Sequence, residues 1–303
     1  MQILVCPGCR TRTPERIDVR TLERSNDLYV CECGRSYPIV DGIPVILEAP
    51  VIEPDPDVSP EAAAALVANL ADDAPYAHLL EHLSIYLDSH WGAQNPLAAK
   101  LAHAEHVALT VELGCSVGRI VHELALSSDH VVGVELSLPA VRRARRLLAG
   151  EDVPYAQRQL GHHYTPAIAH GSVTTNTTLI CGDALDPPLI PGAYDRVVAL
   201  NLLDSVRSPR QLLSVIDGLC APNGEVILSS PYAWQTSIVD APLPFDPAES
   251  LLDILQTGDG LGSRYQILES TDLEWTLRRD ARSSVSYRIH WVRARKHSAS
   301  PTV

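Results

Sequence analysis

The chain has 303 residues, of which 46% are apolar and 20% charged, so it is long enough to bury the core of one sizeable domain plus a small one. Its 37 acidic residues outnumber its 24 lysines and arginines, and the net charge of −13 argues against a protein that mainly coats nucleic acid or an anionic membrane. No apolar run is long enough to span a bilayer and the N-terminus does not resemble a signal peptide, so the expected compartment is the cytoplasm.

Residues 1–50 form the first expected unit, because four of the seven cysteines are clustered there. These are Cys6, Cys9, Cys31 and Cys33. In a reducing compartment this clustering indicates a metal rather than disulfides, and four thiolates with no open position favour a structural Zn²⁺. Fifty residues bury little surface, so the unit is expected to need the metal. PIVDGIPVIL predicts two strands joined by a turn at Asp41-Gly42.

Residues 51–72 are expected to form a proline-rich, acidic linker and a leading helix that starts near Pro60. A larger domain is expected over residues 73–298. It begins with helices at 77–92 and 95–106.

From about residue 108 the pattern alternates between short apolar strands and helices. Strands are predicted at 108–114, 130–137, 177–185, 193–203 and 224–232, and helices at 119–127, 139–150 and 210–220. This alternation predicts an α/β fold with a doubly wound, Rossmann-like sheet. The segment 265–296 predicts an antiparallel pair at one edge, whereas the polar insertion 151–176 lacks periodicity and predicts a functional loop.

The segment VELGCSVGR, residues 111–119, predicts a glycine-rich turn after a buried strand. Gly114, Ser116 and Arg119 occupy the places where a dinucleotide-binding fingerprint has three glycines. With Gly118 they leave a wider turn, which suits a nucleotide without a pyrophosphate. S-adenosylmethionine (SAM) is such a nucleotide.

Three acids follow successive strands at their carboxyl ends, where ligands bind in open α/β sheets. Glu112 is expected to orient the amino group of SAM, Glu135 the ribose hydroxyls and Asp183 the adenine amino group. Each acid alone reads equally as a strand end or helix cap, but the ordered trio with the glycine turn predicts a SAM site. The other residues expected around SAM are Tyr86, Gly114, Cys115, Ser116, Gly118, Arg119, Leu136, Ser137, Gly182, Ala184, Asn201 and Leu202.

The segments GCSVGR, CGDALDPPL, YDRVVALNLLDSV and SSPYAW, in this order, resemble the methyltransferase domains of ovothiol biosynthesis, which are class I SAM-dependent methyltransferases. The resemblance covers residues 108–296 and is looser over 235–262. Those domains methylate a ring nitrogen of a mercaptohistidine, so the resemblance implies N-methylation of a histidine-derived imidazole or thioimidazole. CECGRSYPIVDGIPVIL resembles the small zinc-ribbon proteins that activate methyltransferases acting on tRNA and translation factors, which implies a stabilising or substrate-presenting role.

The methyl acceptor is expected beside the fourth predicted strand. The catalytic candidates are Asn201, Tyr232 and His163, and the substrate-binding candidates are His162, His163, Tyr164, Tyr232 and Trp234. Aromatic rings would suit a cationic product, although packing at the sheet edge explains them equally well. For any single one of His162, His163 and Tyr164, a solvated loop position is the favoured interpretation.

Two other functions remain open from the sequence. Basic runs at 142–146 and 278–296 favour a zinc-ribbon-guided RNA or protein methyltransferase, but residues 1–50 carry six arginines and no lysine against seven acids. The second is a methyltransferase fold kept only as a binding module, which the intact acid trio speaks against. The oligomeric state is left open.

Overall fold

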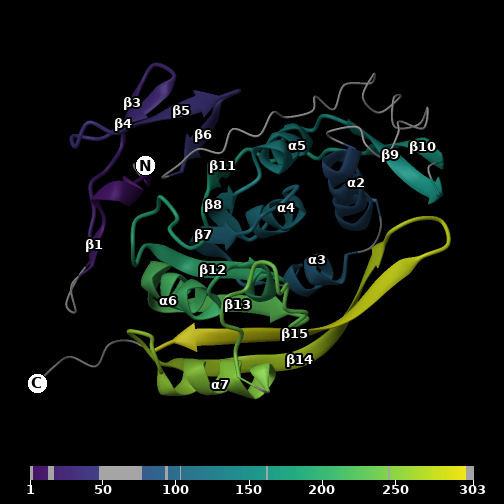
Figure 1. Ribbon diagram of the computed structural model, residues 1–303. Coiled ribbons are helices and arrows are strands. Elements are labelled where there is room, and N and C mark those ends of the chain that lie inside the picture. Colours follow the sequence, from purple (N-terminus) through teal and green to yellow (C-terminus); the bar gives the residue numbers. More distant parts are fainter. Residues whose placement is uncertain are drawn as a thin grey trace, which may run out of the picture.

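The computed structural model describes residues 3–12, 17–47, 77–92, 95–102, 104–161, 163–244 and 246–297. His162, the predicted helix from Pro60 and the expected linker lie outside these ranges. An 11-stranded sheet has the order β14-β15-β13-β12-β7-β8-β11-β6-β5-β4-β3, with helices on both faces (Figure 1). The described part of the chain contains no helix that is both long and apolar enough to span a membrane.

The centre of the sheet consists of parallel strands: β7 (Val107–Leu113), β8 (Ser128–Glu135), β11 (Thr177–Gly182), β12 (Tyr194–Leu200) and β13 (Cys220–Ser230).

The helices are α2 (Ala77–Trp91), α3 (Pro96–Leu101), α4 (Arg119–Ala125), α5 (Leu138–Leu148), α6 (Pro209–Leu219) and α7 (Pro247–Thr257), with short 3₁₀ turns η1 (Pro7–Cys9) and η2 (Leu203–Ser205). Helices α6 and α7 pack on one face and α3, α4 and α5 on the other. Because both faces of the central strands are buried, these strands are apolar along nearly their whole length. The predicted Rossmann-like fold is confirmed.

Helix starts follow from capping residues. Ser137 accepts a hydrogen bond from Ala140 N at the start of α5, and Ser208 caps α6 in the same way. Helix α7 is absent from the sequence expectation, although its signals are all present. Asp246 caps it, Pro247 is its first residue and Gly258 ends it with a φ of 77°.

The C-terminal strands β14 (Tyr265–Arg278) and β15 (Ser284–Lys296) form the predicted antiparallel pair, and β15 pairs with β13. The prediction of an irregular loop over 151–176 is wrong. The segment contains a hairpin, β9 (Val153–Leu160) and β10 (His163–Ala169), that packs on α2. Apolar side chains also lie on the exposed face of this hairpin, among them Leu160 and Ile168, so the apolar period of its strands is hard to see.

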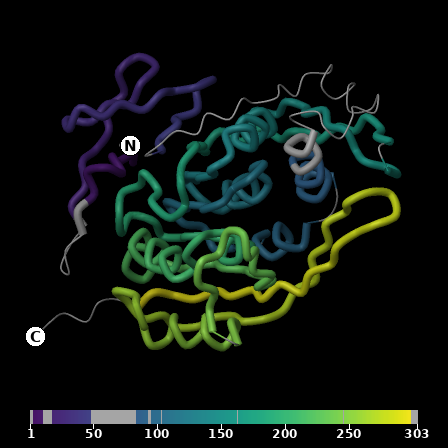
Figure 2. The backbone as a smooth tube through the Cα atoms, in the orientation of Figure 1, coloured from purple at the N-terminus to yellow at the C-terminus, as the bar shows by residue number. Residues whose placement is uncertain are grey.

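The N-terminal segment continues the main sheet. It contributes a short pair, β1 (Thr11–Arg12) with β2 (Ile17–Asp18), and the strands β3 (Glu23–Ser25), β4 (Leu28–Val30), β5 (Ser36–Val40) and β6 (Ile43–Ile46). The predicted turn at Asp41-Gly42 joins β5 to β6, which pairs in parallel with β11. Leu4 also bridges to Leu189, so the N-terminal trace lies along this edge of the sheet (Figure 2).

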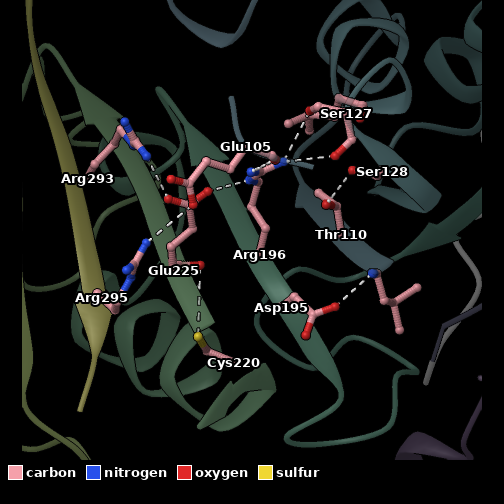
Figure 3. Close-up of polar contacts among 12 residues, drawn as sticks. Glu105, Thr110, Ser127, Ser128, Asp195, Arg196, Cys220, Glu225, Arg293 and Arg295 are labelled. Atoms are coloured by element: carbon pink, nitrogen blue, oxygen red, sulfur yellow. Dashed lines mark hydrogen bonds and ion pairs between the residues drawn. The ribbon is translucent and has the colours of Figure 1, made fainter. Parts of the chain in front are cut away.

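A buried ion network ties β12, β13 and β15 together (Figure 3). Arg196, which is fully buried, donates from Nε to Glu225 Oε1 over 2.6 Å. Arg293 reaches the other carboxylate oxygen over 3.0 Å. Burial opposes the charged form of Glu225, but the two arginines outweigh it and lower its pKa. The network therefore holds the strands together at the end away from Asn201.

Replacing Glu225 with alanine is expected to lower the free energy of unfolding by about 3–5 kcal/mol, because the buried guanidinium group of Arg196 and the partly buried one of Arg293 lose their counter-charge. Since the pKa of Glu225 is lowered on folding, its contribution is present above the unfolded value of about 4.3 and is lost as pH falls below it. Urea unfolding at several pH values measures this. The control Glu274→Ala removes an exposed partner of Arg288 and should cost less than about 1 kcal/mol; equal costs would contradict the assignment.

Candidate active site

A cavity of about 470 Å³ lies at the carboxyl ends of the central strands, beneath α2 and beside β14 and β15. The predicted residues that line it are Tyr86, Glu112, Gly114, Cys115, Ser116, Glu135, Leu136, Ser137, Asp183, Ala184, Asn201 and Leu202. Residues that the sequence places on four different strands therefore meet in one site. Two of the predicted glycines do not line the cavity. Gly182 is the last residue of β11, and Gly118 is the N-cap of α4.

The glycine turn after β7 depends on left-handed backbone. Gly114 has a φ of 76°, and a Cβ there would lie 2.9 Å from Leu202 Cδ1. Gly118 has a φ of 79°, and a Cβ there would lie 2.8 Å from Ala144 Cβ on α5. Ser116 also takes a positive φ of 46°, which is strained for a residue with a side chain. The turn thus keeps the cavity open at Gly114 and lets α4 pack closely on α5 at Gly118.

Glu112 is a buried carboxylate in the wall of the cavity. It is 3% exposed, and its Oε2 atom has no hydrogen-bond partner among the described residues. Burial, followed by repulsion from Glu135, raises the pKa of Glu112 well above its usual value. An unpartnered buried acid fits a cationic ligand group, because a positive charge would restore the interactions that burial removes. The amino group of SAM has this chemistry.

Glu135 is held in place by the glycine turn. The amides of Ser116 and Ser137 donate to its two carboxylate oxygens over 3.0 and 2.9 Å. Burial raises its pKa, although these amides act in the opposite direction. Each oxygen keeps further acceptor capacity, which suits the two hydroxyls of a ribose. At the end of β11, Asp183 accepts from the amide of Leu185 over 2.8 Å.

The loop after β13 contributes alternate residues to the cavity. Pro231, Ala233 and Gln235 line it, whereas Tyr232 and Trp234 do not. The Tyr232 hydroxyl instead lies 2.8 Å from His290 Nδ1, behind the wall. The expectation that Tyr232 and Trp234 form the acceptor wall therefore lacks support from the geometry. Tyr232 has a left-handed φ of 52°, and its ring lies against Trp234 and His290 instead.

Other predicted residues also lie away from the cavity. Arg119 pairs with Glu123 over 2.6 Å and lies over the ring of Trp91. His163 and Tyr164 belong to the β10 hairpin, where His163 is exposed. Asn201 does line the cavity, and its side-chain oxygen accepts from Ser229 Oγ over 2.9 Å.

The structure adds residues to the wall that were not among the sequence candidates. They include His90, Asp204, Gln235, Trp275, Leu277 and Tyr287. The Trp275 and Tyr287 rings stack with centroids 5.7 Å apart, and Trp275 Nε1 has no partner among the described residues. His90 Nε2 is likewise buried and unpaired, and burial, with a smaller contribution from Arg119, lowers the pKa of His90 to about 4. The period-two spacing of Trp275 and Leu277 indicates a shared strand face, but sequence alone does not show what that face meets.

The N-terminal cysteines form a second candidate site. The four Sγ atoms of Cys6, Cys9, Cys31 and Cys33 all lie within 4.8 Å of one another. Two of the separations, Cys6–Cys33 and Cys9–Cys31, are 3.9 and 3.7 Å. Tetrahedral zinc with bonds of about 2.3 Å would place its sulfur ligands about 3.8 Å apart, so the cluster fits that ion. The other three cysteines are buried.

Comparisons with known proteins agree with this fold. Residues 111–228 match the family model described as a methyltransferase domain. Over 137 residues the chain is 28% identical to the ubiquinone biosynthesis O-methyltransferase of Sodalis glossinidius, covering 43% of this chain and 46% of that protein, so it spans about half of this relative's length.

Two solved structures illustrate the similarity of fold. A chain from the complex between the Haloferax volcanii Trm112 methyltransferase activator and a methyltransferase is 15% identical, with a TM-score of 0.50, and the match covers 74% of this chain and 97% of that one. The N-methyltransferase NodS from Bradyrhizobium japonicum is 13% identical, with a TM-score of 0.46, and the match covers 75% of this chain and all of that one. The strand order and the match over residues 111–228 together show a Rossmann-like methyltransferase fold.

Proposed function

We propose that the protein transfers the methyl group of SAM to a ring nitrogen of a small imidazole or thioimidazole compound, such as a histidine derivative. The main support is the convergence of Glu112, Glu135 and Asp183 on one cavity, where Oε2 of Glu112 has no hydrogen-bond partner among the described residues. A non-catalytic binding module would have no need of a buried unpaired acid, which costs folding free energy. Methyl transfer from a sulfonium is an in-line displacement, so the enzyme mainly holds the nucleophile close and excludes water.

The choice of acceptor rests on the other half of the cavity and on the sequence resemblance. Trp275 and Tyr287 offer flat surfaces for a planar ring. A neutral imidazole nitrogen, with an ordinary pKa of about 6.5, needs little help from a base. The cavity lies under α2, between the ends of the central strands and the residues Trp275, Leu277 and Tyr287 of β14 and β15, which favours a small molecule over a polymer.

The basic runs that favoured an RNA substrate are largely neutralised within the fold. The ion pairs are Arg142–Asp41, Arg146–Glu151, Arg288–Glu274, Arg293–Glu225, Arg295–Glu105 and Lys296–Asp217. A polyanion would have to compete with these internal acids for the same charges. This pairing supports the small-molecule proposal over the RNA alternative.

We also propose that the cysteine cluster holds a structural Zn²⁺. The metal would link η1 to the turn after β4, in a segment with few apolar contacts of its own. Because β6 from this segment extends the sheet next to β11, the metal would also support the strand that precedes Asp183.

SAM binding should depend on the charge of Glu112. The variant Glu112→Gln keeps the size but removes the attraction to an ammonium group, so SAM affinity should fall about ten- to a hundredfold. In the wild type, affinity should fall as pH drops through the raised pKa of Glu112, because the protonated acid attracts the ammonium less. Calorimetry at several pH values tests this. The charge-matched control Asp129→Asn lies at the far end of β8, and the same loss there would argue against the assignment.

The zinc proposal predicts about one zinc per chain by elemental analysis. A strong chelator should lower the melting temperature, and Cys33→Ser should lose the metal. The control Cys181→Ser changes a buried cysteine outside the cluster and should keep the zinc. A metal-free preparation with an unchanged melting temperature would refute the proposal.

The substrate class can be tested by incubation with SAM and one of three substrate sets. These are imidazoles and histidine derivatives, catechols, and bulk RNA or protein. Mass spectrometry should find a gain of one methyl group on an imidazole nitrogen. Catechols are included because the relative from Sodalis glossinidius is an O-methyltransferase. Methylated RNA with unreacted imidazoles would favour the RNA alternative, and no SAM binding at millimolar ligand would refute the enzyme proposal altogether.

A further inference from the structure

The cavity is strongly acidic. Four carboxylates line it: Glu112, Glu135, Asp183 and Asp204. No lysine or arginine lies in its wall within the described ranges, and none of the four acids has an ion-pair partner there. His90 adds no positive charge near neutral pH, because burial lowers its pKa to about 4. The cavity is therefore suited to cations and hydrogen-bond donors and repels anions.

Three of these acids lie on the side of the cavity assigned to SAM. Glu112 lies near the end of β7, Glu135 is the last residue of β8 and Asp183 follows β11, and these three strands are neighbours in the sheet. Asp204 lies in η2 after β12, next to the loop after β13. It is therefore the fourth acid, and the SAM assignment gives it no role.

Asp204 is 4% exposed, and Ser230 Oγ donates to its Oδ1 over 3.2 Å. Burial raises its pKa, although nearby hydrogen bonds act in the opposite direction. An independent sign of a missing ligand comes from the same cavity. Trp275 is 6% exposed, and its Nε1 donor has no partner in the described part of the chain. Buried polar atoms are rarely left unpaired unless a ligand or water satisfies them.

We propose that Asp204 binds the methyl acceptor by accepting a hydrogen bond from its N–H group. The inference rests on the proposed function and specifies its acceptor as a nitrogen compound that carries an N–H for Asp204 and a free lone pair on the attacking nitrogen. In an imidazole, an N–H bound to Asp204 leaves the lone pair of the other ring nitrogen available for attack. Trp275 and Tyr287 provide aromatic faces that also favour a cation.

The chemical step balances without a further reactant. A bond forms between the acceptor nitrogen and the methyl carbon as the sulfur–methyl bond breaks. The bonding electrons return to sulfur and give S-adenosylhomocysteine. The acceptor loses its N–H proton to the Asp204 carboxylate, which releases it to water when the product leaves. Acceptors that place a phosphate or carboxylate against Asp204 are excluded by like-charge repulsion.

The test uses three probes of nearly the same shape and different charge: benzamidine, benzamide and benzoate. Calorimetry measures their binding to the full chain saturated with S-adenosylhomocysteine. Benzamidine should bind at least about tenfold more tightly than benzamide, and benzoate should not bind measurably. In Asp204→Asn the preference for benzamidine should fall to less than about threefold, while S-adenosylhomocysteine affinity changes less than about twofold.

A matched control is Asp272→Asn, which removes one negative charge from an exposed position on β14 outside the cavity wall and should keep the preference. If the wild type binds S-adenosylhomocysteine but shows no preference for benzamidine, or Asp204→Asn keeps the preference, the inference is overturned and the proposed function stands. If the wild type binds neither SAM nor S-adenosylhomocysteine, the proposed function itself fails. Once an acceptor is identified, Asp204→Asn should also raise its KM.

Discussion

Burying the Glu112 carboxylate without a cation is the costly feature on which the arrangement of this site depends. Desolvation disfavours the charge, and the neighbouring Glu135 adds repulsion. The turn that contains Gly114 and Ser116 holds Glu135 in place, because the Ser116 amide donates a hydrogen bond to its carboxylate. Such a site is complete only when a positively charged ligand enters it, and SAM carries an ammonium and a sulfonium.

The stability that offsets this cost comes from elsewhere in the sheet. The central strands are buried on both faces, and Arg196 with Glu225 crosses from β12 to β13 at the end away from Asn201. Charges at that end are paired, whereas the carboxylates in the cavity are unpaired. One end of the sheet therefore has charges that are paired within the protein. The other end has carboxylates without a counter-charge among the described residues, and this is the end suited to binding a ligand.

The N-terminal segment protects the edge of the sheet. Without β6, strand β11 would expose its backbone groups, and edge strands of this kind readily pair with other chains. The apolar residues Leu4, Leu22 and Tyr37 share one core with Leu185 and Leu189. A segment that looks from its cysteines like a separate domain is thus part of the same sheet.

The strand–helix alternation, the glycine turn and the three acids at strand ends could be predicted from the sequence, because periodicity and turn chemistry are local properties. The four cysteines could also be assigned to one cluster, because this assignment requires only that two turns meet. Three features could not be predicted: that β6 pairs with β11, that Ala233 rather than Tyr232 lines the cavity, and that Asp204 and Trp275 complete its wall. All three features depend on contacts between segments that are far apart in the sequence. Those contacts fix which strands pair and in which direction a side chain points.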